Sequence, residues 1–327
     1  MAETYFLTGA LGCIGAWVVK HLVERGNSPV VFDLGKDRRR LEDVISPQDL
    51  RRVIFVEGDI TDAAAVARAV QDCGAKKIIH LAGLQVPACR ANPIAGAQVN
   101  VLGTIHLFEA ALAVGAHRVV YASSAAVYSL DDAGPDGLPP SESTRTTPTT
   151  HYGVYKQANE GNARVYWLER RMSSVGLRPL TVYGVGRDQG MTSDPTRAMK
   201  AAVLGRRFHI RFDGATDFLH VSDCAHAFLA AADRSPEGAN VYNLHGDSVT
   251  VSSIVDRIVA HGPPGTRERI TLGGPVLPIP AAMDGSAVIR DLGPLPHTDL
   301  DRGVRETMQH FSMLQREGRL STADLDA

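Results

Sequence analysis

The sequence has few cysteines, little net charge and no long apolar run. Its four cysteines, scattered through 327 residues, lack the close spacing of metal ligands. We therefore expect no disulfide scaffold and no metal site, and a reduced, cytoplasmic setting. The net charge of −2 gives no reason to expect a nucleic acid or an anionic membrane as a partner. No run approaches the length of a membrane span, and no charged-then-apolar leader precedes Thr8 and Gly9.

A glycine-rich turn lies near the N-terminus, between an apolar segment and an amphipathic one. Residues 4–8 read as a buried strand, and residues 16–25 read as a helix. In the turn between them, Gly9 permits a tight bend, Gly12 lets backbone N–H groups approach a pyrophosphate, and Gly15 allows close helix packing. Strand, glycine turn and helix in this order predict a dinucleotide site at the helix N-terminus.

An acidic residue follows the second predicted strand. Asp33 comes 18 positions after Gly15, where a carboxylate can accept hydrogen bonds from an adenosine ribose and repel a 2′-phosphate. This favours NAD over NADP. The basic run at residues 36–40 leaves two interpretations open, since its arginines are either a solvated loop or ligands for a 2′-phosphate.

Apolar strands alternate with helices through the first half of the chain, including expected strands at 53–56, 77–81, 118–123 and 177–182. We therefore predict an α/β fold, a Rossmann-type doubly wound parallel sheet with a smaller C-terminal substrate-binding lobe. The rhythm breaks beyond Tyr183. We expect residues 1–182 to form the NAD-binding domain, with 217–245 returning to it. Residues 183–216 and 246–327 would form the lobe.

Tyr152 and Lys156 place a phenol and an ammonium four residues apart. On a helix these positions share a face, so the ammonium is expected to favour the phenolate and lower the pKa of Tyr152. A phenol tuned in this way exchanges a proton with an alcohol or ketone near neutral pH. Ser124 follows a predicted strand, and its hydroxyl is expected to hold the substrate oxygen beside Tyr152. Ser124, Tyr152 and Lys156 are the predicted catalytic residues.

Six motifs in order resemble the extended short-chain dehydrogenase/reductases, the NAD-dependent epimerase/dehydratase family. They include 8–15, 80–83, 121–128, Tyr152-x-x-x-Lys156 and 218–223. The resemblance covers nearly the whole chain and implies an NAD-dependent enzyme of carbohydrate metabolism that forms a homodimer. It places Asp59 and Ile60 near the adenine and Asn100 in support of the active-site helix. The expected cofactor-binding residues are Gly9, Leu11, Gly12, Cys13, Ile14, Gly15, Asp33, Asp59, Ile60, Leu81, Ala82, Gly83, Asn100, Ser123, Tyr152, Lys156, Pro179 and Val182.

Two positions depart from the pattern of nucleotide-sugar epimerases. Where those enzymes usually carry an Asn and an Arg, this chain has Thr181 and Thr216, and the missing Arg would pair with phosphate. Ala125 and Ala126 replace the acidic pair of the sugar-nucleotide dehydratases, which argues against dehydration.

These departures favour hydride transfer at a secondary alcohol or ketone of a carbohydrate-like small molecule, as in a sugar or sugar-acid dehydrogenase. A nucleotide-sugar 4-epimerase of the UDP-glucose type is the alternative. A non-catalytic dinucleotide-binding sensor is a further one. The residues expected to contact substrate are Gln85, Ser124, Thr181, Arg187 and Thr192.

Overall fold

A seven-stranded sheet forms the centre of the larger lobe in the computed structural model, which describes residues 4–134 and 137–326. Its strands pair in parallel in the order β10-β6-β5-β4-β1-β2-β3. They are β1 (Tyr5–Thr8), β2 (Val30–Asp33), β3 (Ile54–Glu57), β4 (Lys77–His80), β5 (Arg118–Ala122), β6 (Ser174–Arg178) and β10 (Ala239–Asn243). The order reverses between β1 and β4, which confirms the predicted doubly wound Rossmann-type sheet.

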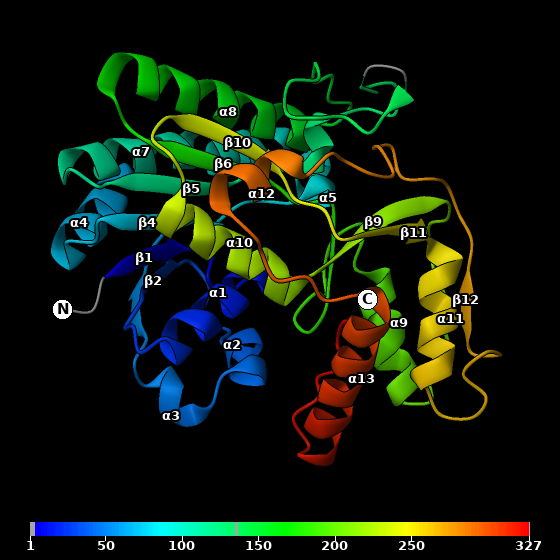
Figure 1. Ribbon diagram of the computed structural model, residues 1–327. Coiled ribbons are helices and arrows are strands. Elements are labelled where there is room, and N and C mark those ends of the chain that lie inside the picture. The colour runs from blue at the N-terminus through cyan, green and yellow to red at the C-terminus, as the bar shows by residue number, and fades with distance from the viewer. Residues whose placement is uncertain (1–3, 135–136, 327) are drawn as a thin grey trace.

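Helices cover both faces of this sheet (Figure 1). One face carries α1 (Cys13–Glu24) and α10 (Val221–Arg234), and the other carries α4 (Ala63–Cys73), α7 (Gly103–Ala113) and α8 (His151–Arg170). Neighbouring strand residues point to opposite faces, so Leu7 joins the core with Val19 of α1 and Phe6 joins the core with Phe108 of α7. Burial on both faces explains why these strands are apolar throughout. Two short helices, α2 (Arg39–Val44) and α3 (Pro47–Leu50), follow β2.

The smaller lobe is built from two short sheets and four helices. One sheet contains β7 (Thr181–Tyr183), β9 (Ala215–His220) and β11 (Asp247–Thr250), and the other pairs β8 (Phe208–Ile210) with β12 (Ile270–Leu272). The helices α9 (Asp194–Val203), α11 (Val251–His261), α12 (Ser286–Leu292) and α13 (Leu300–Arg316) complete the described elements of residues 181–326 beyond α10 and β10. In Figure 1, α9, α11 and α13 lie beside one another at the lower right, on the side away from β1 and β2.

The chain crosses between the lobes at points that differ from those expected. The predicted strand 177–182 is broken after Arg178, and Thr181 already pairs with β9 in the small sheet. Pro179 explains the break, because it has no backbone N–H to continue a ladder. Residues 217–220 likewise belong to the small sheet, so only α10 and β10 of the segment 217–245 return to the large one.

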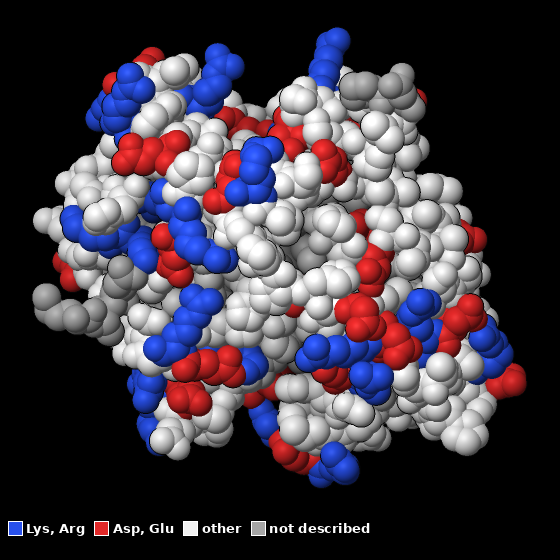
Figure 2. Space-filling model, viewed as in Figure 1, with Lys and Arg blue, Asp and Glu red and all other residues white. Residues whose placement is uncertain are grey.

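Charged side chains are mixed over the surface. Lys and Arg alternate with Asp and Glu over the face drawn in Figure 2, around a pale, hollowed centre. Within residues 4–134 and 137–326, no helix is both long and apolar enough to cross a membrane.

Candidate active site

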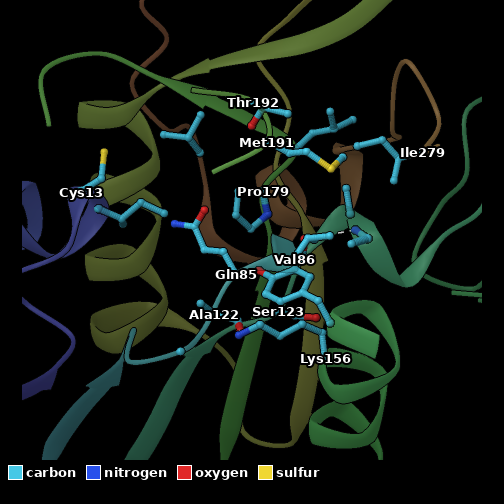
Figure 3. Close-up of a pocket in the computed structure, with 18 of the residues that line it drawn as sticks. Cys13, Gln85, Val86, Ala122, Ser123, Lys156, Pro179, Met191, Thr192 and Ile279 are labelled. Carbon is cyan, nitrogen blue, oxygen red and sulfur yellow. Dashed lines mark hydrogen bonds between the residues drawn. The ribbon is translucent and has the colours of Figure 1, made fainter. Parts of the chain in front are cut away.

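A cavity opens where β1, β4, β5 and β6 end, beside the reversal of strand order (Figure 3). The carboxyl ends of parallel strands are the usual ligand site of this architecture. The cavity contains most of the predicted site residues: Gly9, Gly12, Cys13, Ile14, Gly15, Leu81, Gly83, Gln85, Ser123, Ser124, Tyr152, Lys156, Pro179, Val182, Arg187 and Thr192.

The glycine turn has the geometry that a dinucleotide requires. Gly9 adopts φ +70°, and a Cβ on it would lie 2.3 Å from the Ala82 nitrogen. A Cβ on Gly15 would lie 2.5 Å from the Gly9 carbonyl oxygen. Helix α1 starts at Cys13 with no side chain capping its N-terminus and no acidic residue in its first turn. Its N–H groups therefore face the cavity ready for a pyrophosphate, so the residues present fit a dinucleotide.

Asp33 lies at the end of β2, next to the glycine turn, on the side where the adenosine ribose is expected. Its carboxylate accepts hydrogen bonds from the backbone N–H of Leu11 and of Gly35, both at 3.1 Å. These contacts turn the carboxylate across the glycine turn, beside the place of an adenosine ribose.

The basic run that follows β2 is divided between solvent and internal contacts. Lys36, Asp37 and Arg38 are exposed in a loop, as the solvated interpretation expects, and the Arg38 guanidinium lies 3.6 Å from the centre of the Phe55 ring. Arg40 binds Asp188 with an Nη2–Oδ1 distance of 2.7 Å and donates to the Leu11 carbonyl at 3.0 Å. Arg39 also contacts Asp188, at 3.4 Å, so these two arginines are used in internal contacts rather than left for a 2′-phosphate.

Several expected cofactor residues do not line the cavity. Asp59 accepts a hydrogen bond from the Thr61 N–H at 2.8 Å, and Ile60 is buried against Gly103. Leu11, Ala82 and Asp33 are likewise not among the residues that line the cavity. Their expected contacts stay predictions, for a part of the cofactor that extends beyond the cavity.

Asn100 supports the loop after β4. It lies in a π-helical turn, η1 (Gln98–Leu102), between α6 (Pro93–Ala97) and α7. Its Oδ1 accepts from the Leu84 N–H at 2.7 Å, and its Nδ2 donates to the Leu84 carbonyl at 2.9 Å. With both ends of the amide engaged, Asn100 positions the loop between β4 and α5 (Val86–Ala91).

Ser123 contributes to the cavity wall, but its hydroxyl points elsewhere. The hydroxyl donates to Glu160, whose carboxylate also binds the buried Arg178 at 2.6 Å. This network fixes the end of β5 against α8. The same connection orients Ser124, the next residue, toward the cavity.

The three catalytic candidates converge in this cavity. Thr150 caps α8 by accepting from the Gly153 N–H at 3.0 Å, and a Cβ on Gly153 would lie 2.1 Å from the Ala126 carbonyl. This close approach brings Tyr152 to Ser124, which caps the short helix η2 (Ala125–Val127). A hydrogen bond links the Tyr152 and Ser124 side chains.

Lys156 lies beneath Tyr152, with its Nζ 5.4 Å from the centre of the phenol ring. It donates to the Ala122 carbonyl at 2.6 Å and is almost fully buried. Burial lowers the pKa of Lys156 to about 8.

The expected lowering of the Tyr152 pKa by Lys156 is not what the structure shows. Burial raises the pKa of Tyr152, opposed by its hydrogen bond with Ser124 and by the positive charge of Arg187. The phenol is desolvated more than the nearby cations compensate, which helical spacing alone does not reveal. Arg187 is thus a functional residue whose effect on Tyr152 was missed.

Of the expected substrate residues, four line the cavity and one does not. Gln85, Arg187 and Thr192 lie on its wall with Ser124. Thr181 is fully buried, and its Oγ1 lies 2.9 Å from the Oγ1 of Thr216. The expected substrate contact at Thr181 is therefore wrong, because its hydroxyl is used between two strands of the small sheet.

Sequence reasoning missed the apolar cover of the cavity. Met191, Pro278 and Ile279 of the smaller lobe line it together with the catalytic residues (Figure 3). These residues belong to irregular segments without a motif, so no sequence signal connects them with Tyr152.

Comparisons with known proteins agree with this geometry. The model of the NAD dependent epimerase/dehydratase family matches residues 5–244. The chain belongs to this family. It is therefore an NAD-dependent enzyme.

Similar curated proteins include UDP-glucose 4-epimerases from several organisms. The one from Bos taurus is 32% identical over 277 residues, which cover 75% of this chain and 77% of the relative. The one from Azospirillum brasilense is 30% identical over 336 residues, which cover 95% of this chain and 92% of the relative. Among solved structures, MoeE5 in complex with UDP-glucose and NAD has a TM-score of 0.79 at 26% identity, covering 97% of this chain and 99% of that one.

Proposed function

We propose that this family member oxidises a secondary alcohol of a carbohydrate-like substrate that has no nucleotide, and releases NADH. The observation that carries the proposal is the contact between Thr181 and Thr216, the positions where the resemblance leads us to expect an Asn and an Arg. Both threonines are buried, and their hydroxyls satisfy each other at 2.9 Å. Neither hydroxyl is available to a diphosphate, and no cation stands at either position.

The catalytic residues have separate roles in this reaction. Bound NAD supplies the hydride acceptor. The oxygen of Ser124 accepts from the Ala126 N–H at 3.1 Å, and its hydroxyl hydrogen-bonds with Tyr152, so it is placed to donate to a substrate oxygen bound beside that phenol. The phenolate of Tyr152 takes the alcohol proton, and Lys156 holds a positive charge below the ring at 5.4 Å, which stabilises that phenolate. Lys156 is buried and both Ser124 and Tyr152 are half-buried in the cavity wall, so access of water to the proton transfer is restricted.

A nucleotide-sugar 4-epimerase is the second candidate. Two observations favour it: the similarity to UDP-glucose 4-epimerases, and a second cavity that shares Met191 and Pro278 with the catalytic one. Arg90 and Arg211 line that second cavity and offer positive charge to a diphosphate. In this case the glycine turn and Lys156 would keep the reduced cofactor in place, so that the hydride could return to the same carbon.

A substrate panel separates the two candidates. Free sugars, aldonates, uronates and UDP-glucose are each incubated with the protein and NAD, and NADH absorbance is followed. NADH formed with a substrate that lacks a nucleotide supports the dehydrogenase. No NADH with those compounds, together with interconversion of UDP-glucose and UDP-galactose, would overturn it in favour of the epimerase.

Tyr152→Phe separates either enzyme from a sensor without catalysis. Removing the phenol oxygen should lower kcat by about 10²–10⁴-fold while NAD binding is retained. Tyr155→Phe is the matched control, because that hydroxyl lies on the same helix but donates to the Pro93 carbonyl at 2.8 Å. Full turnover in Tyr152→Phe would contradict the mechanism.

A further inference from the structure

Arg187 brings a positive charge into the catalytic cavity without an acidic partner. It lines the cavity with Ser124 and Tyr152, and its Nη2 donates to Thr192 Oγ1 at 3.0 Å. Its Nε is buried and has no hydrogen-bond partner, and no carboxylate of residues 4–134 or 137–326 forms an ion pair with it. The side chain is half-buried, and a buried N–H donor without a partner is costly unless a ligand accepts from it.

The neighbouring carboxylate does not neutralise Arg187. Asp188 is next in the chain, but it binds the Arg40 guanidinium at 2.7 Å and contacts Arg39 at 3.4 Å. Two arginines from the dinucleotide-binding lobe therefore use the oxygens of Asp188. This arrangement leaves the charge of Arg187 directed to the cavity.

A glycine places an amide beside the guanidinium. Gly190 adopts φ +98°, and a Cβ on it would lie 1.9 Å from Gln85 Oε1 and 3.2 Å from Arg187 Nη2. Only glycine permits this approach of the two loops. Gln85 and Thr192 both point into the cavity in Figure 3, so they form a polar corner with Arg187.

The polar corner lines the same cavity as Tyr152 and Ser124. The positive charge of Arg187 acts to lower the pKa of Tyr152, against the effect of burial. A substrate alcohol held by Tyr152 and Ser124 would therefore have the rest of its carbon chain in the cavity that the corner lines. The rest of the wall is apolar at Met191, Pro278 and Ile279.

We propose that Arg187, with Gln85 and Thr192, binds a carboxylate of the substrate, which makes the substrate a polyhydroxy acid such as an aldonate. One guanidinium with two neutral neighbours matches a single negative charge, whereas a phosphate dianion would need further cations. The carboxylate is unchanged in the reaction: the alcohol carbon loses hydride to NAD, and its hydroxyl loses a proton to Tyr152. This inference rests on the proposed dehydrogenase and names its substrate class.

The experiment compares acids with alcohols that differ from them in one group. D-gluconate and D-galactonate are paired with D-glucitol and D-galactitol, in which CH₂OH replaces the carboxylate. Binding to the NADH-loaded protein is measured by NADH fluorescence, and turnover with NAD is measured for the same pairs. Inorganic phosphate is included as a competing anion. Thus binding is read independently of catalysis.

In the unmodified protein, at least one aldonate should bind about 10- to 100-fold more tightly than its alditol, and more tightly than phosphate. Arg187→Gln should remove this preference and leave NADH affinity unchanged. Arg187→Lys should keep part of it, since the charge remains but the paired donors do not. Arg207→Gln, at an exposed arginine of the same lobe, is the matched control and should behave like the unmodified protein.

Equal binding of acids and alditols, no binding of either, or tightest binding of phosphate would overturn the carboxylate proposal. An equal loss of affinity for the aldonate and for its alditol in Arg187→Gln would also overturn it. A failure of the proposed dehydrogenase function would instead appear as interconversion of UDP-glucose and UDP-galactose without release of NADH. The two failures are therefore distinguishable.

Discussion

Arg40 and Asp188 form an ion pair with three N–O contacts, which joins the dinucleotide-binding lobe to the loop that follows β7. Arg40 Nη2 lies 2.7 Å from Asp188 Oδ1, and Arg40 Nε lies 3.2 Å from both carboxylate oxygens. The same guanidinium donates to the carbonyl of Leu11 in the glycine turn at 3.0 Å. One side chain thus holds the turn that meets the cofactor and the loop that carries Arg187.

Asp188→Asn should raise KM for both NAD and substrate, because the glycine turn and the loop that carries Arg187 lose a common partner. The pair is only partly buried, so we expect a loss in the free energy of unfolding of about 1–3 kcal/mol. Steady-state kinetics and urea unfolding measure the two effects. Asp37→Asn removes an exposed carboxylate 3.9 Å from Arg39 and serves as the control. A change in only one of the two KM values would contradict the shared role.

The hydrogen bond between Thr181 and Thr216 should appear as coupling in a double-mutant cycle. Thr181→Val or Thr216→Val leaves one buried hydroxyl without its partner, which should cost about 1–3 kcal/mol of unfolding free energy. The double variant should lose clearly less unfolding free energy than the sum of the losses in the two single variants, because it leaves no buried hydroxyl without a partner. Urea unfolding of the four proteins tests this, and additive losses would show that the two hydroxyls act independently.

Asp33 should be responsible for discrimination against NADP. Asp33→Ala should narrow the affinity gap between NAD and NADP, since a carboxylate repels the 2′-phosphate. Asp33→Asn keeps an oxygen for the Leu11 N–H and removes the charge, so it isolates the electrostatic part. Titration of both dinucleotides is the measurement, with the exposed Asp37→Ala as control. Equal affinity for both in the unmodified protein would refute this role.

Lys156 should make the protein less stable near neutral pH than a variant without the ammonium. Its pKa falls from 10.5 to about 8 on burial, so the unfolded chain holds the proton more strongly than the folded one. The resulting penalty is complete below about pH 8 and fades as pH rises toward the unfolded pKa. Lys156→Met should therefore lose activity yet unfold with about 1–3 kcal/mol more free energy near pH 7.

The stability difference between Lys156→Met and the unmodified protein should shrink between pH 8 and 10. Urea unfolding without cofactor across this range provides the test. Lys36→Met changes a lysine whose side chain is 79% exposed, and it should show no such trend. A constant difference, or a less stable Lys156→Met at neutral pH, would count against the burial penalty.

A homodimer remains a prediction, supported by an apolar stripe on α8. Val154, Val165 and Leu168 share one face of the helix and are 44%, 48% and 57% exposed. Leu168→Glu should convert a dimer into a monomer, as measured by light scattering coupled to size-exclusion chromatography. Leu130→Glu, at an exposed leucine outside α8, should not. A monomeric unmodified protein would refute the expectation.

Local patterns were sufficient to predict the sheet, the glycine turn and a set of catalytic candidates, Ser124, Tyr152 and Lys156, that meet in one cavity. Gly9 and Gly15 are required by backbone contacts made within a single strand-turn-helix unit. The spacing of Tyr152 and Lys156 depends only on helical periodicity. The break at Pro179 was missed, because the apolar run 177–182 continues through it while the chain passes to another sheet.

The sequence by itself determined the family and the glycine turn, and it predicts Tyr152 as the proton-transfer group, because each depends on residues close together in the chain. Only the tertiary structure decided that burial raises the pKa of Tyr152 and that Thr181 faces Thr216. It also decided that Asp188 forms an ion pair with Arg40, so that Arg187 lines the cavity without this neighbouring carboxylate as a partner. Desolvation and contacts between distant segments depend on which surfaces pack together, and that information is absent from local spacing.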